Sequence, residues 1–209
     1  MIEIQLQFIS AIIILASTAV PIYLTIKLKD NLKKLTLILT VFILIHAVYH
    51  VLGFLGYSLL AERVFQPLSV AVLIFFGMVY SGFTKPKNGS VKKMVMTLNP
   101  GIFLLFTNNI TIILLLIAFG IFVCQATRSK SIRSFQFQIS VFLIVWILGE
   151  IVGNLEDIGI NLFPALQGDF GLEIHVISMV FFSLMLWLRF YYSERSGKKM
   201  IEDMDTTLR

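Results

Sequence analysis

The sequence predicts an all-α protein: a polytopic membrane bundle of seven transmembrane helices. Three observations predict this fold class. Of the 209 residues, 57% are hydrophobic and only 14% are charged, whereas about a quarter of the residues in soluble proteins are charged. Long apolar runs recur along the whole chain, as in a protein that crosses a bilayer many times. Lysine and arginine gather in the short segments between those runs.

The first three helices are predicted at 7–27, 35–57 and 65–83, each close to the roughly 20 residues that cross a hydrocarbon core. Pro21 is expected to kink the first of them. The fourth, at 94–107, is shorter and contains Asn99, Pro100 and Gly101. By hydropathy alone this segment is equally compatible with a re-entrant piece. The last three helices are predicted at 109–127, 136–158 and 171–192.

The distribution of positive charge favours seven crossings over six. With seven, 16 of the 17 lysine and arginine residues fall on one side and only Arg63 falls on the other. Without 94–107 the division becomes 8 against 9. Cytoplasmic loops carry the Lys/Arg excess, so the N-terminus is predicted outside and the C-terminus inside. The net charge of +5 is thereby explained by orientation, and we expect no nucleic-acid partner.

The predicted organisation is one seven-helix transmembrane domain, 1–193, followed by a short charged cytoplasmic tail, 194–209. A parallel 3+1+3 repeat is also predicted, with halves 7–83 and 109–192 joined by the linker helix 94–107. A shift of 100 residues places His50 on Glu150, and a shift of 106 places Ser69 on His175. Because the linker crosses once, both halves would have the same orientation.

This layout resembles that of the sugar-transporting SWEET and PQ-loop proteins, which would imply transport. The Pro-Gln signature of those proteins is missing: the first helix has "VPIY", and Gln66-Pro67 has the reversed order. In hydropathy the outline also resembles the seven-helix sensor region of some membrane histidine kinases. Neither resemblance assigns a family.

Ionisable residues inside the predicted spans share the outer half of the bilayer. His46 and His50 lie one helical turn apart, as do Glu150 and Asn154. A charge deep in hydrocarbon costs about 2.5–3.5 kcal/mol or more, so such groups usually face the bundle interior and find partners. We therefore expect a polar pocket that opens outward. The predicted lining residues are His46, His50, Glu150, Asn154 and His175.

Two kinds of site fit these residues. A metal site would use His46, His50, His175, Glu150 and Met179. Imidazoles with a carboxylate suit zinc, copper or iron, and a methionine ligand would favour copper; zinc and copper are the predicted candidates. A ligand-binding or proton-relay site would use Glu150, Asn154 and Asp157. The structural alternative is that the histidines hydrogen-bond neighbouring helices and that Met179 only packs.

The leading hypothesis is a non-enzymatic protein of the cell membrane that holds a small ligand or metal ion. It would act as a sensor or as an accessory subunit of a membrane complex, with lipid and other membrane subunits as partners. The alternative is a small-solute or metal-ion transporter. Apart from Lys27, the end residue of the first predicted span, no lysine lies within a span, which excludes a retinal Schiff base. The single cysteine, Cys124, excludes an internal disulfide framework.

Overall fold

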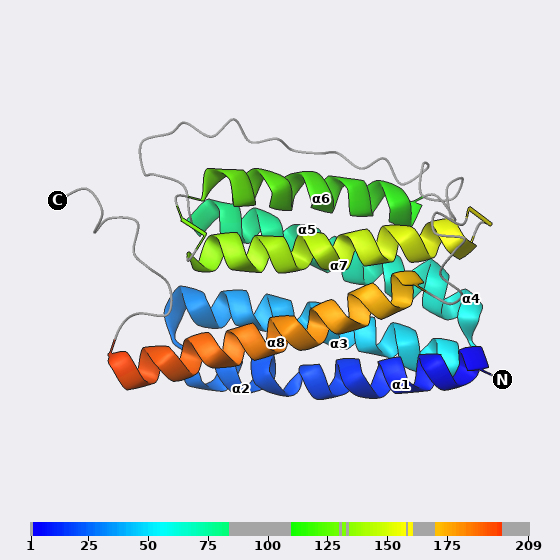
Figure 1. Ribbon diagram of the computed structural model, residues 1–209, viewed down its shortest axis with the longest axis horizontal. Coiled ribbons are helices and arrows are strands. Elements are labelled where there is room, and N and C mark those ends of the chain that lie inside the picture. The colour runs from blue at the N-terminus through cyan, green and yellow to red at the C-terminus, as the bar shows by residue number, and fades with distance from the viewer. Residues whose placement is uncertain are drawn as a thin grey trace.

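The computed structural model describes residues 2–83, 110–129, 131–132, 134–157, 159–160 and 170–197. The described chain is all-helical, as predicted. Its elements are α1 (Ile2–Ser17), α2 (Ala19–Lys27), α3 (Asp30–Phe54), α4 (Ser58–Leu60), a π-helical turn η1 (Ala61–Phe65), α5 (Gln66–Phe83), α6 (Ile110–Arg128), α7 (Phe135–Asp157) and α8 (Phe170–Ser196) (Figure 1).

Six helical segments are long and apolar enough to cross a membrane. They are Phe8–Lys27, Asp30–Phe54, Ser58–Gly82, Ile110–Arg128, Phe135–Glu156 and Gly171–Ser196. Helices satisfy every internal backbone polar group without water, which is what a hydrocarbon environment requires. These segments coincide with six of the seven predicted helices. The predicted helix 94–107 and most of the tail 194–209 lie outside the described residues.

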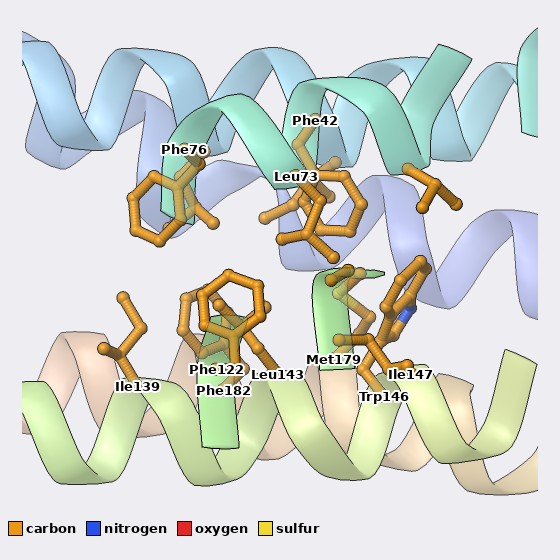
Figure 2. Packing of buried hydrophobic residues seen from close by; sticks show 14 of the residues in the cluster. Phe42, Leu73, Phe76, Phe122, Ile139, Leu143, Trp146, Ile147, Met179 and Phe182 are labelled. Carbon is orange, nitrogen blue, oxygen red and sulfur yellow. The ribbon is translucent and has the colours of Figure 1, made fainter. Parts of the chain in front are cut away.

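The six segments pack in chain order, each against the next, and α8 returns to contact α1 and α2. The described spans therefore form a ring whose centre is filled by side chains. Figure 2 shows this filling, with Phe42, Leu73 and Phe76 facing Phe122 and Phe182 across the interior. Phe42 on α3 meets Trp146 on α7 edge to face, with their ring centroids 4.9 Å apart.

α5 and α6 run parallel, which bears on the predicted fourth helix. Gly77 lies against Ile121 and Phe122, and the Gln125 amide nitrogen lies 3.0 Å from the Ser81 hydroxyl, so the residue numbers rise together along both helices. The end of α5 and the start of α6 consequently lie at opposite ends of the bundle (Figure 1). A further crossing between them would produce this arrangement; seven spans and the internal repeat remain predictions.

The first span is interrupted at Thr18, between α1 and α2, in the turn that precedes Pro21. This position agrees with the kink predicted from that proline. Proline has no amide hydrogen, so the carbonyl four residues earlier loses its helical donor. That carbonyl belongs to Ser17, and the Ser183 hydroxyl of α8 donates to it at 2.8 Å. In lipid a neighbouring hydroxyl is one of the few replacements for the lost bond, so the kink also attaches the first span to α8.

Only Leu28 and Lys29 separate α2 from α3. Asp30, which begins α3, adopts a positive φ of 52°, a conformation that aspartate tolerates better than most residues. The link is therefore a tight reversal, and the two helices form an antiparallel hairpin. Lys27, Lys29, Lys33 and Lys34 surround it.

Candidate metal site

α3 carries two histidines into the interior of the ring. His46 and His50 lie one turn apart and therefore project from the same face of the helix. They lie about 12 and 6 Å along the axis from Phe54, the last residue of α3. Their side chains are 0% and 1% exposed. Because α3 ends at Phe54, opposite the basic α2–α3 hairpin (Figure 1), both histidines lie in the half of the bundle away from that hairpin.

A close crossing of α7 and α8 brings the other two candidate ligands together. A Cβ at Gly171 would lie 2.3 Å from the backbone nitrogen of Gly153, and one at Gly149 would lie 2.8 Å from the backbone nitrogen of His175. Only glycine permits this approach of two backbones. Glu150 on α7 and His175 on α8 are therefore held side by side, with side chains that are 3% and 5% exposed.

The three imidazoles converge on one point. The Nε2 atom of His50 lies 3.2 Å from Nε2 of His46 and 3.0 Å from Nε2 of His175. One ligand atom from each histidine can be chosen so that all three lie within 4.8 Å of one another. These are also the only three histidines in the chain. We call this group the histidine cluster.

Glu150 lies beside the histidine cluster and connects it to α5. Its Oε1 atom is 3.2 Å from Nδ1 of His175 and 3.5 Å from Nε2 of His46. Its Oε2 atom accepts a hydrogen bond of 3.1 Å from the amide of Gln66. Both carboxylate oxygens are thus engaged by polar groups from other helices, as a carboxylate in an apolar interior requires.

Gln66 reaches Glu150 from an irregular turn. Pro67 cannot donate to the carbonyl of Arg63, and the wider η1 turn of Ala61–Phe65 precedes it. Such π-helical turns often occur at functional sites because they change the direction of the following side chains. The Ser69 hydroxyl donates to the carbonyl of Gln66 at 2.7 Å, which occupies a backbone oxygen near the turn.

Aromatic rings enclose the histidine cluster. Trp146 meets His46 edge to face at 5.0 Å between ring centroids, and Tyr49 lies 4.7 Å from His50 by the same measure. Phe42 stacks beside His46 one turn below it. The indole Nε1 of Trp146 is buried and, among the described residues, has no hydrogen-bond partner. The histidine cluster is therefore a polar group surrounded by aromatic and aliphatic side chains.

The structure brings together His46, His50, His175 and Glu150 from the predicted site. Asn154 instead donates to the backbone carbonyl of Glu150 at 2.7 Å, within its own helix. Met179 is buried in the apolar core, beside Trp146 and Ile147 in Figure 2. Asp157 is the last residue of α7, and its side chain lies outside the described part. The binding roles of all these residues, and the outward opening of a pocket, remain predictions.

Gln66, Trp146 and the three crossing glycines are parts of the site that the sequence argument did not include. A signal existed for the glycines, since Gly149 and Gly153 form a G-x-x-x-G pair in an apolar segment, a pattern of closely packed membrane helices. Gln66 stands one residue before a proline near the start of a predicted span. It carried no comparable signal, because its partner lies 84 residues away.

The fold and the cluster together define a class: a membrane-compatible helical bundle with a buried group of three histidines supported by a carboxylate. Comparison of the chain with protein-family models, with curated proteins and with solved structures finds no significant match.

Proposed function

We propose that this chain is an integral membrane protein that holds one transition-metal ion, zinc or copper, in the histidine cluster. It serves as a sensor or as an accessory subunit of a membrane complex. The observation that carries the proposal is the position of His50 Nε2 within 3.2 Å of two other imidazole nitrogens. The metal is the candidate ligand because imidazole nitrogen is a preferred donor for both ions.

Hydrogen bonding alone accounts poorly for this convergence. An imidazole nitrogen in the neutral ring carries either one proton or one lone pair, and each points in a single direction in the ring plane. The Nε2 atom of His50 can therefore make one well-aligned hydrogen bond, yet it has two close nitrogen neighbours. A cation among the three nitrogens would accept a lone pair from each ring, which removes the conflict.

The spacing of the nitrogens also suits a metal ion. Two nitrogens bound at about 2.0–2.1 Å to a tetrahedral ion lie about 3.3–3.4 Å apart. The two Nε2 contacts, at 3.2 and 3.0 Å, need only a small expansion to reach that spacing. Three imidazoles with no thiolate favour Zn²⁺ or Cu²⁺ over Cu⁺, which prefers sulfur ligands.

Retention of the ion fits the interior better than passage through the bundle. Beyond the histidine cluster, toward the basic end, the centre is filled by buried apolar side chains such as Leu39, Phe76 and Leu186. The hydroxyls of Thr25 and Thr40 lie 3.2 Å apart and also bond their own helices. A transporter would need a polar path through this layer. The transporter therefore remains the second candidate, and its support is the predicted repeat together with the polar groups inside the spans.

The proposal includes the orientation and the seventh crossing. Seven described basic residues lie toward the end where α2, α6 and α8 finish, whereas Arg63 lies at the other end (Figure 1). They are Lys27, Lys29, Lys33, Lys34, Arg128, Arg189 and Arg195. The positive-inside rule then places the histidine cluster nearer the outside. The parallel run of α5 and α6 supports a crossing by the chain between them.

Cysteine labelling tests this orientation. In a Cys124→Ser background, we expect Tyr57→Cys to react with a membrane-impermeant maleimide added to intact cells. We expect Ser131→Cys to react only after permeabilisation, because it lies in the loop between α6 and α7 at the basic end. Equal labelling of the two variants in intact cells, or the reverse pattern, would contradict the predicted topology.

Metal analysis tests the proposed function. We expect the full chain, purified in mild detergent without chelators or an affinity tag of histidines, to contain about one zinc or copper ion per molecule. The chain in sealed vesicles should retain that ion without moving zinc or copper across the bilayer. Metal-free protein that also fails to bind added Zn²⁺ or Cu²⁺ would refute the proposal, and protein-dependent uptake into vesicles would favour the transporter.

A further inference from the structure

We infer that the metal site proposed above has three protein ligands and an open fourth position, which takes water, hydroxide or a small anion. In this arrangement Glu150 is a positioning residue that acts through His175 and does not ligate the ion. The inference rests on the proposed function and deepens it. It concerns the chemistry of the site: a closed four-ligand site stores an ion, whereas an open position allows the ion to bind a further small molecule.

The contact between Glu150 and His175 carries this inference. Oε1 of Glu150 lies 3.2 Å from Nδ1 of His175, while Nε2 of the same ring lies 3.0 Å from His50. The two nitrogens of an imidazole point away from each other. The imidazole of His175 also bonds the backbone of Gly171, one turn earlier in α8. When Nδ1, the nitrogen beside the carboxylate, carries the proton, the lone pair on Nε2 is directed toward His50. Carboxylate–histidine–metal arrangements of this kind orient the ligand and increase its basicity.

Gln66 holds Glu150 in this supporting position. Its amide donates to Oε2 at 3.1 Å, so the carboxylate is fixed at both oxygens by α5 and α8. With these contacts in place, the carboxylate of Glu150 is directed at Gln66 and His175. The separation of 3.5 Å from Oε1 to Nε2 of His46 is longer than the distances to Gln66 and to His175. The group whose ligand atoms all lie within 4.8 Å of one another contains the three histidines and not Glu150.

Burial limits what the open position can accept. The four residues are at most 4% exposed, and the rings of Trp146 and Tyr49 lie against the histidines. The exogenous ligand must therefore be of the size of water or a linear triatomic anion. Azide is a suitable probe because it is small, anionic and binds both cobalt and copper ions through nitrogen.

The experiment uses the full chain in detergent, loaded with Co²⁺ as a spectroscopic substitute for Zn²⁺ and titrated with azide. We expect a saturable change in the cobalt visible absorption with one azide per cobalt. Glu150→Gln should still bind one Co²⁺ and still respond to azide, with Co²⁺ affinity lower by about 10–100-fold, as is typical when an outer-shell partner is lost. Gln66→Ala, which leaves the carboxylate in place, should weaken Co²⁺ binding less. Thr40→Ala, a buried change on α3 away from the cluster, should leave the affinity unchanged.

Two results would overturn the inference and differ from failure of the proposed function. An azide-insensitive cobalt spectrum in the unmodified chain would indicate a closed site. A Glu150→Gln spectrum shifted as for replacement of a direct oxygen ligand would make Glu150 the fourth ligand. Both results presuppose bound Co²⁺. Absence of Co²⁺ binding in the unmodified chain would instead refute the metal site itself, and this inference with it.

Discussion

Replacement of His50 by alanine is expected to abolish high-affinity metal binding. His50 has the central position in the histidine cluster, because its Nε2 atom is the one that lies within 3.2 Å of both other Nε2 atoms. Its removal leaves His46 and His175 without the ligand between them. The loss of affinity should exceed the roughly 10–100-fold decrease expected for an outer-shell residue. Titration of the purified variant with Co²⁺ or Zn²⁺ measures the effect directly.

Two further variants make the His50 result specific. His50→Gln keeps a polar side chain of similar length in the interior and separates loss of a ligand from a packing defect. Thr40→Ala removes a buried hydroxyl from the same helix, below the histidines, and should bind metal as the unmodified chain does. Wild-type affinity in a monodisperse His50→Ala preparation would show that the three nitrogens are not a common ligand set.

Replacement of Gly171 by alanine is expected to separate α7 from α8. The new Cβ would lie 2.3 Å from the nitrogen and 2.6 Å from the Cα of Gly153, and 2.8 Å from the carbonyl oxygen of Gly149. All three neighbours are backbone atoms, so no side chain can rotate away to make room. Overpacking typically costs about 1–3 kcal/mol, and this crossing should lie at or above the upper end.

The Gly171 variant should therefore show a lower temperature of unfolding by circular dichroism and weaker metal binding, since His175 moves with α8. Gly120→Ala on α6 provides the matched control, because a Cβ there meets nothing within 4 Å. If Gly171→Ala and Gly120→Ala unfold at the same temperature and bind metal equally, then α7 and α8 do not approach as closely as described.

Hydropathy and helical rise were sufficient to predict much of this structure. Six apolar segments became six helices, and counting 1.5 Å per residue placed His46, His50, Glu150 and His175 near one level. Their convergence followed because polar groups in an apolar bundle are stabilised by one another. Both the positions of the helices and the depths of these residues along them depend only on local sequence.

Which side chains meet in the site was harder to predict from the sequence. Asn154 was predicted to line the pocket from its position one turn after Glu150, but a short amide can bond the carbonyl four residues earlier in its own helix, and it does so here. Gln66 was missed because its position depends on the η1 turn, and helical periodicity does not anticipate a π-helical insertion. The predicted helix 94–107 lies outside the described residues.

The two-residue link between α2 and α3 has a consequence for biosynthesis. With a connection of only two residues, the first span and α3 cannot lie far apart when the first span enters the bilayer. We therefore expect the pair to insert as one helical hairpin, so that His46 and His50 enter lipid with a packed neighbour already present. The third histidine comes only with the last described helix, 125 residues after His50, so the histidine cluster is complete only after most of this chain has been synthesised.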